Sequence, residues 1–386
     1  MRLKFAIASF FFLWTLSSYA SDWQQLASFG AEGRHRGTAI SIGTRGYMGL
    51  GHYNGTGNNF IKADWWEYDP ATNAWTQKSD HPTGNYGVIS FSVASVGYVG
   101  SGQISSNIYK YDPTTNLWTL MGTPPVSFNN STAMVVEGRP YCFVAGSNQL
   151  YEYEYLTDTW LLKNNPPFSL GFWTSSFAIG EKGYVKSGSS LWEYKPFLDE
   201  WIQRAQCPGI ATAASVAFEQ YGMGYLVCGY GGSLSNVTSE VWEFDPIVNQ
   251  WSQLEDFPGA SRRFSSGFSI GNKCFMGTGT NGTNFGDFWQ FDALANLDGQ
   301  ALENLSIRVF PNPATEYVNF EFDGSENFSL NDMHLSITSI TGQEVYSQSV
   351  QSTETTVNTG TYQKGTYFYS FSDKNNLIKT GQFIVN

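Results

Sequence analysis

The segment Trp66-Glu67-Tyr68-Asp69-Pro70-Ala71-Thr72-Asn73-Ala74-Trp75 decides the fold of this chain, because close copies of it recur along most of the sequence. Each copy joins an aromatic-x-aromatic triplet to a short turn, with a Trp seven residues after the second aromatic. Complete copies stand at 66–75, 109–118, 151–160, 192–201 and 242–251. Successive Trp residues lie 43, 42, 41 and 50 positions apart. A period of roughly 45 residues in a chain rich in Gly and aromatic residues predicts a β-propeller, with one four-stranded sheet per repeat.

The remaining parts of each repeat read as short strands joined by turns. An alternating small and apolar run such as Thr38–Ile42 comes first, and a second strand that ends in Gly follows it, as in Tyr47–Gly51. The triplet forms the third strand, an Asp-Pro or Asn-containing turn follows, and the Trp marks the fourth strand. The period-2 geometry of a strand puts both triplet aromatics on one face, where they pack against the neighbouring sheet.

A sixth triplet, Trp289-Gln290-Phe291, has Asp298 where its Trp is expected. Six triplets predict six blades, and the last blade lacks a fourth strand. The segment Asp22–Leu26 offers one, because Trp23 lies 52 residues before Trp75. We therefore expect the N-terminal strand to close the ring, which also removes an exposed sheet edge.

Residues 23–292 resemble the kelch repeat, whose pattern is a Gly-ended second strand followed by Tyr-Asp-Pro and a Trp. The usual Gly-Gly doublet is mostly Gly-x-Gly or a single Gly here. The resemblance implies an all-β, six-bladed kelch-type β-propeller whose ring is closed by the N-terminal strand.

Composition and charge exclude several classes of function. The 386 residues carry a formal charge of -12, which argues against a nucleic-acid partner because phosphates would not be neutralised. Four His and four Cys are scattered without metal-binding spacing, so we expect no zinc or copper centre and no cofactor. The Cys residues fall in different repeats, which favours buried thiols and leaves a Cys207–Cys228 bridge as the alternative.

The first 20 residues have the pattern of a signal peptide. Arg2 and Lys4 precede the apolar run Phe5–Leu16, and Ser18-Tyr19-Ala20 fits a cleavage site. The run is too short to span a bilayer, and a buried N-terminal strand is the alternative reading. No other stretch is apolar enough to cross a membrane. The predicted domains are a signal peptide at 1–20, a propeller at 21–298, a linker at 299–304 and a C-terminal domain at 305–386.

The C-terminal domain reads as a small antiparallel β-sandwich. Its predicted strands are Tyr317–Phe322, His334–Ile340, Glu344–Val350 and Thr366–Ser372. The segments Phe310–Ala314, Thr341-Gly342-Gln343, Gly365-Thr366-Tyr367 and Thr380–Val385 together resemble the C-terminal sorting domain of the type IX secretion system.

That resemblance implies a route and a partner. Such domains direct their cargo across the outer membrane of Bacteroidota-type cells through the secretion machinery. They are typically cleaved there, often with attachment of the cargo to surface lipopolysaccharide. We therefore expect a secreted or cell-surface protein, with a generic sandwich used for adhesion as the alternative.

In a propeller the first strand of each repeat lines the central channel. We expect the ligand site on the loops that lead into these first strands, because functional residues on such scaffolds cluster on loops over a rigid base. Kelch proteins that bind ligands often use Arg and polar residues there. The candidates are Arg34, His35, Arg36, Tyr86, Asn130, Phe172, Trp173, Arg262 and Arg263. Repeats six and one are ring neighbours, so the four Arg are expected to converge into a pocket for a carboxylate or sulfate. Structural ties to loop carbonyls or acidic residues are the alternative.

Trp173 has two readings as well, a stacking platform for a sugar ring or a plug of the channel. Long loops at 51–64, 229–240 and 279–287 belong to contiguous blades and are expected to form a wall over the Arg cluster. The sequence thus favours a monomeric binding module for a glycan or another acidic or hydroxylated ligand. A glycan-active enzyme (an acidic-sugar mutarotase, isomerase or lyase) would use Tyr86, His35 or Glu32 as its acid or base. A protein-interaction surface is the third hypothesis.

Overall fold

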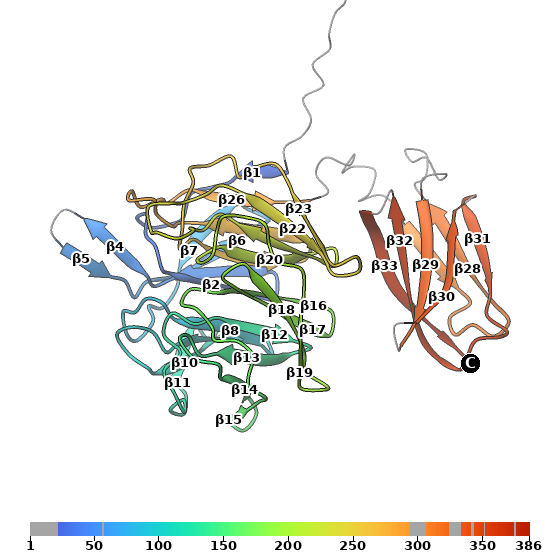
Figure 1. Ribbon diagram of the computed structural model, residues 1–386, viewed down its shortest axis with the longest axis horizontal. Coiled ribbons are helices and arrows are strands. Elements are labelled where there is room, and N and C mark those ends of the chain that lie inside the picture. The colour runs from blue at the N-terminus through green and yellow to red at the C-terminus, as the bar shows by residue number, and fades with distance from the viewer. Residues whose placement is uncertain are drawn as a thin grey trace, which may run out of the picture.

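The computed structural model describes residues 22–55, 58–293, 306–323, 333–340, 343–350, 352–373 and 376–386 (Figure 1). The predicted signal peptide and the predicted linker lie outside these ranges. Every regular element within them is a β-strand. Among the described residues, no helix has the length and apolarity needed to span a membrane.

Twenty-four strands of the N-terminal part form six antiparallel sheets of four strands. We number these sheets as blades 1 to 6 along the chain and give the strands of each blade from the innermost to the outermost. Blade 1 contains β2 (Thr38–Ile42), β3 (Arg45–Gly49), β6 (Trp65–Asp69) and β7 (Ala74–Gln77). Blade 2 contains β8 (Ile89–Val93), β9 (Val96–Gly100), β10 (Ile108–Asp112) and β11 (Leu117–Leu120). Blade 3 contains β12 (Ala133–Val136), β13 (Arg139–Phe143), β14 (Leu150–Glu154) and β15 (Thr159–Leu162). Blade 4 contains β16 (Ser175–Ile179), β17 (Lys182–Ser187), β18 (Ser190–Lys195) and β19 (Glu200–Gln203). Blade 5 contains β20 (Val216–Gln220), β21 (Met223–Val227), β22 (Val241–Asp245) and β23 (Gln250–Gln253). Blade 6 contains β24 (Ser266–Ile270), β25 (Lys273–Gly277), β26 (Phe288–Phe291) and β1 (Trp23–Gln25).

The six innermost strands contact one another in a closed cycle, β2 to β8, β12, β16, β20, β24 and back to β2. The ring is closed by the N-terminal strand, since β1 pairs with β26 and places Trp23 opposite Phe291. The Trp23 ring lies 4.8 Å from Phe291 and 4.9 Å from Phe257, measured between ring centroids. The predicted six-bladed propeller and its closure are therefore confirmed.

The second aromatic residue of the repeated triplet is buried in every blade. In blades 1 to 4 this Tyr donates its hydroxyl proton to an Asn or Asp five residues later, as Tyr68 does to Asn73 (3.0 Å) and Tyr194 to Asp199 (2.6 Å). Those turn residues have φ of 49° and 52°, in the left-handed region that Asn and Asp tolerate best. One polar residue thus forms the turn and satisfies the buried hydroxyl.

The C-terminal part forms two facing sheets. One contains β27 (Ser306–Phe310), β28 (Tyr317–Asp323) and β31 (Glu354–Asn358), and the other contains β30 (Glu344–Ser349), β29 (Met333–Ser339), β32 (Gly365–Asp373) and β33 (Asn376–Val385). Side chains of both sheets share one apolar core, including Val318, Phe320, Leu335, Phe371 and Phe383. The predicted sandwich is confirmed, and β27, β31 and β33 are strands that the sequence analysis did not assign.

Candidate ligand site at the channel mouth

A ring of backbone hydrogen bonds surrounds one end of the propeller channel, which we call the mouth. It joins six residues, one from the loop before each innermost strand: Arg36, Gly87, Asn130, Trp173, Ala214 and Phe264. Each N–H donates to the carbonyl of the ring residue in the preceding blade, and the cycle closes from Arg36 to Phe264, with N–O distances of 2.7–3.3 Å. We call these six residues the collar.

All six collar residues have φ between 54° and 62°, although only one of them is Gly. Other residues rarely adopt this conformation, and it persists here because every collar N–H and C=O is paired with a neighbouring blade. Gly87 is the one position without room for a side chain. A Cβ there would collide with the Asn130 side chain and lie 2.9 Å from Cη2 of Trp173. Blade 2 therefore leaves space into which the Trp173 ring extends.

Two arginines at this mouth lie over the rings of Trp173 and Phe264, which we call the aromatic floor. The guanidinium carbon of Arg36 lies 4.1 Å from the Phe264 ring centroid and 5.3 Å from that of Trp173. That of Arg263 lies 5.6 Å from Phe264. The Trp173 and Phe264 rings meet edge to face at 4.9 Å. Arg36 and Arg263 thus share one floor, and the mouth concentrates positive charge in an acidic protein.

Neither arginine has a carboxylate partner within the part of the chain that the structure describes. Burial lowers the pKa of both guanidinium groups, and the charge of Arg263 lowers that of Arg36 further. The Nε and Nη1 atoms of Arg263 are buried and donate no hydrogen bond to any of the described residues. A bound anion would relieve this uncompensated charge.

The other two candidate arginines do not reach the mouth, which corrects the expectation that all four converge. Arg34 is 1% exposed and binds both carboxylate oxygens of Asp64 at 2.5 and 2.9 Å. Arg262 is fully buried and binds both oxygens of Asp287 at 2.6 and 2.8 Å. Each also donates to a loop carbonyl, so these two fit the structural alternative.

His35 is buried and its ring contacts the guanidinium of Arg36. Its Nδ1 lies 3.2 Å from Nη1 of Arg36, and its Nε2 lies 3.4 Å from Nδ1 of His52 and 3.1 Å from Nδ2 of Asn54. Burial, together with the charges of Arg36, His52 and Arg263, lowers the pKa of His35 to about 3. The neutral imidazole therefore accepts a hydrogen bond from Arg36 and orients its guanidinium.

The remaining candidates line or border the mouth. Tyr86 is half-buried, with its ring 5.1 Å from that of His52. Phe172 is 54% exposed, next to Trp173. The side-chain oxygen of Asn130 is buried without a hydrogen-bond partner among the described residues. Trp173 packs edge to face against Phe264 and is partly exposed, and its two predicted roles, stacking platform and channel plug, both remain predictions.

The loop between Gly51 and Asp64 contains a hairpin that the sequence analysis read as an irregular loop. Its strands are β4 (His52–Gly55) and β5 (Asn58–Ile61), and it projects from the propeller at the left of Figure 1. Backbone hydrogen bonds join His52 to His35 at its base, and Asn284 of blade 6 donates to the Asn54 carbonyl (3.4 Å). The hairpin thus positions His52 and Asn54 beside His35.

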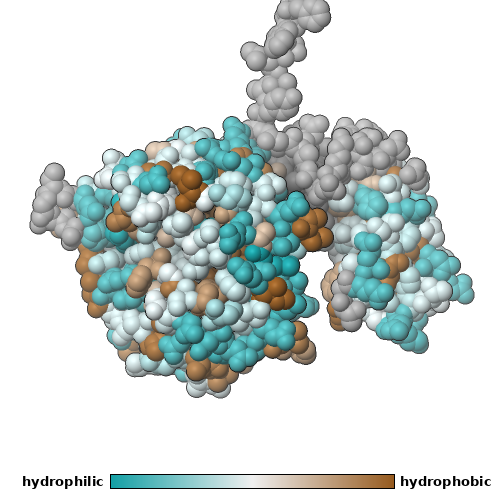
Figure 2. Space-filling model, in the orientation of Figure 1, coloured by the Kyte–Doolittle hydropathy of each residue, from teal (hydrophilic) through white to brown (hydrophobic). Residues whose placement is uncertain are grey.

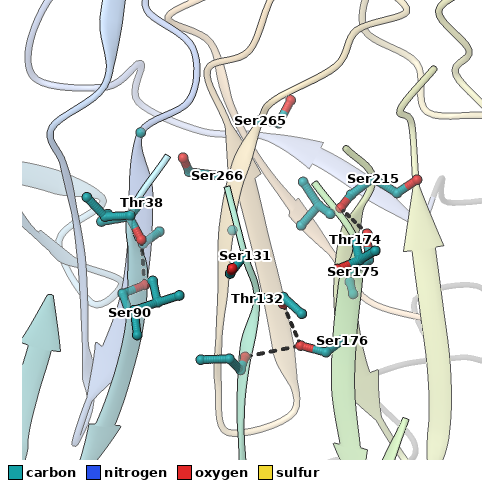
Figure 3. A pocket seen from close by; sticks show the side chains of 18 residues that line it. Thr38, Ser90, Ser131, Thr132, Thr174, Ser175, Ser176, Ser215, Ser265 and Ser266 are labelled. Carbon is teal, nitrogen blue, oxygen red and sulfur yellow. Dashed lines mark hydrogen bonds between the residues drawn. The ribbon is translucent and has the colours of Figure 1, made fainter. Parts of the chain in front are cut away.

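A chamber of about 210 Å³ lies on the inner side of the collar (Figure 3). Its lining begins with the residue after each collar residue, and it consists mainly of Ser and Thr. Neither Arg36 nor Arg263 lines it. The collar thus separates a basic, aromatic mouth from a neutral, hydroxyl-lined interior.

Comparison with known proteins identifies the C-terminal part and supports the fold. Residues 308–386 match the family described as "Secretion system C-terminal sorting domain". No curated protein matches the chain. The chain is similar to the solved structure described as "Structure of YjhT", with a TM-score of 0.57 and 14% identity over 69% of this chain and 95% of that one. That likeness supports the propeller fold alone. The protein therefore carries a type IX sorting domain behind a β-propeller, and this domain marks it for export, to secretion or attachment at the cell surface.

Proposed function

We propose that the exported propeller is a binding module for an acidic glycan or a similar ligand with a carboxylate or sulfate group. The observation that carries the proposal is the pair Arg36 and Arg263, which share an aromatic floor and have no carboxylate partner among the described residues. Guanidinium groups bind carboxylate and sulfate through two parallel hydrogen bonds, which suits a ligand of this charge.

Groups around the arginines suit the rest of a sugar. Phe172 and the exposed part of Trp173 offer ring faces on which a pyranose can stack, as aromatic side chains do in many ligand sites. The mouth therefore offers positive charge and aromatic ring faces within one small area.

The alternative of a glycan-active enzyme has weaker support, because two of its three acid–base candidates are engaged elsewhere. Glu32 is ion-paired with Lys62 and with Arg34, and hydrogen bonding to Lys62 is the main cause that lowers its pKa. His35 is 1% exposed, and its pKa of about 3 makes it a weak base. The Tyr86 hydroxyl forms no hydrogen bond with another described residue that could relay a proton, and this supports binding over turnover.

Isothermal titration against acidic oligosaccharides and their neutral, carboxyl-reduced counterparts tests the proposal. We expect binding of acidic ligands only, weakened at least about tenfold by Arg36→Ala or Arg263→Ala, since charge-assisted pairs contribute roughly 1.5–3 kcal/mol. Arg45→Ala is the matched control, because Arg45 lies at the other end of blade 1 and pairs with Asp69. Equal affinity of all three variants would refute this site. Turnover of an acidic sugar that Tyr86→Phe abolishes would favour the enzyme.

A further inference from the structure

Tyr230 borders the mouth from a position that the sequence analysis did not single out. An isolated antiparallel bridge joins it to Ala213, the residue before the collar in blade 5. The same bridge recurs in blades 1 and 6, where it joins His35 to His52 and Arg263 to Thr280. Tyr230 therefore lies beside the loop position that Arg263 occupies in the next blade.

The ring of Tyr230 packs at the edge of the aromatic floor. Its centroid lies 5.8 Å from that of Phe264, the ring that also lies beneath Arg36 and Arg263. Burial lowers the pKa of both guanidinium groups, and electrostatic coupling to the Tyr230 hydroxyl opposes that shift in each of them. One phenol hydroxyl therefore lies near both arginines.

Tyr86 approaches the same pair of arginines from blade 2. Its ring lies 5.1 Å from that of His52, and its hydroxyl also opposes the lowering of the Arg36 pKa by burial. Tyr86 and Tyr230 are both half-buried, and neither hydroxyl is hydrogen-bonded to a described residue or fully enclosed. Two phenol hydroxyls and two guanidinium groups thus face a ligand from the neighbouring blades 5, 6, 1 and 2.

The number and directions of these donors favour one shape of anion. A carboxylate is planar, and a single guanidinium group can pair with both of its oxygens. A sulfate or phosphate ester has three terminal oxygens that point in different directions, so donors on several sides can bind it together. Donors from four blades around one aromatic ring match the second shape.

We infer that the two tyrosines, together with the arginine pair, make the mouth selective for a tetrahedral oxyanion, a sulfate or phosphate ester, over a carboxylate. This inference rests on the proposed function, because it names the acidic group that the same mouth binds. On the face of the protein shown in Figure 2, hydrophobic residues form only small patches among hydrophilic ones, so the described residues there offer no broad apolar surface as a competing site.

Isothermal titration of the full chain with three sugars that differ only at C6 tests the selectivity: glucose 6-sulfate, glucose 6-phosphate and glucuronate. We expect both esters to bind at least about tenfold more tightly than glucuronate, and the tighter ester identifies the natural group. Tyr230→Phe keeps the ring but deletes one hydrogen bond to a charged group, so it should weaken the esters about tenfold and glucuronate less than about twofold. Tyr155→Phe, in the turn between β14 and β15, is the matched control and should change neither affinity.

A second measurement uses no sugar and so does not depend on which glycan the protein binds. Crystals of the unmodified protein soaked in sodium selenate, a tetrahedral oxyanion, should give an anomalous peak over the Phe264 ring, within hydrogen-bonding reach of the Tyr230 hydroxyl. A mouth without selenate, or selenate bound by the arginines alone, would overturn the inference.

The outcomes separate this inference from the proposed function. Equal affinity for the three sugars, or an ester preference that survives in Tyr230→Phe, would overturn the selectivity and leave the binding function intact. Ligand affinity that does not depend on Arg36 and Arg263 would refute the site itself, and the selectivity with it.

Discussion

Arg262 and Asp287 form a two-point ion pair inside blade 6, and Arg34 and Asp64 repeat it in blade 1. In both blades the Asp also accepts a hydrogen bond from the Trp two residues later, at 2.8 Å. Burial raises the pKa of Asp287, but the hydrogen bonds and charge of Arg262 outweigh it and hold that pKa below its usual value. The same arrangement thus ties the loop before the innermost strand to the third strand in two neighbouring blades.

Removing the carboxylate of this pair should destabilise the propeller severely. Asp287→Ala leaves the Arg262 guanidinium buried without its counter-ion, which costs about 3–5 kcal/mol. The midpoint of urea denaturation, followed by Trp fluorescence, measures the loss. Arg45→Ala, which removes the more exposed Arg45–Asp69 pair, should cost less than about 1 kcal/mol. Similar losses in both variants would contradict a structural role for Arg262.

Asp22 should make the ring closure sensitive to pH. Burial, and after it the negative charges of Glu255, Asp292 and Glu243, raises the pKa of Asp22 to about 6. A raised carboxyl pKa favours the protonated form in the folded state, so this contribution to stability is full below about pH 4 and is lost as the pH rises through 6.

Asp22→Asn should therefore stabilise the protein at pH 7.5 by about 1 kcal/mol once solvent screening is allowed for, and should have no effect near pH 4. Urea denaturation at the two pH values measures the difference. Asp80→Asn, at an exposed position in blade 1, is the control and should change little at either pH. An equal gain from Asp22→Asn at both pH values would show that Asp22 is not titrating in this range.

Trp23 should be essential to the closed ring. Its side chain is 6% exposed and packs against Phe257 and Phe291, so Trp23→Ala should cost about 3–5 kcal/mol. Hydrogen exchange should accelerate first in β26, the strand that β1 covers. Trp23→Phe keeps an aromatic ring in the site and should retain most of the protection. If β26 remained protected in Trp23→Ala, closure would not depend on this residue.

The four cysteines should be inert thiols. All are free and buried, and burial raises the pKa of Cys228 and of Cys274 to about 12. We expect no reaction with a thiol reagent in the native protein at pH 8, and four reactive thiols after denaturation without reductant. A count of two would show a disulfide, and Cys207 with Cys228 would be the first pair to examine because they border one small cavity.

The propeller was predictable because the same sequence pattern recurs in every blade. The Trp spacing reports the period of the blades, and the missing sixth Trp together with Trp23 indicates the closing strand. Both signals depend on short-range patterns, which a sequence displays directly. The β4–β5 hairpin gave no such signal, since its Gly- and Asn-rich stretch resembles an ordinary loop.

The candidate site was harder to predict because two arginines of the same loop have different roles. Arg34 forms a buried ion pair, whereas Arg36, two positions later, lies at the mouth. Arg34 and Arg36 are distinguished by Asp64, which lies some 30 residues away and pairs only with the first of them. A signal was nevertheless available. Asp64 and Asp287 both stand two residues before the first Trp of their triplets, and their blades are the two that carry Arg at the equivalent loop position. The collar left no trace in the sequence, because its backbone bonds tolerate Arg, Gly, Asn, Trp, Ala and Phe alike.

That tolerance separates the architecture of the mouth from its chemistry. Main-chain hydrogen bonds join the six blades around the axis, so side chains at the five ring positions other than Gly87 can be exchanged while the platform beneath them stays in place. A lineage that carried this scaffold to the cell exterior could thus acquire a new ligand through a handful of substitutions, without rebuilding a single blade.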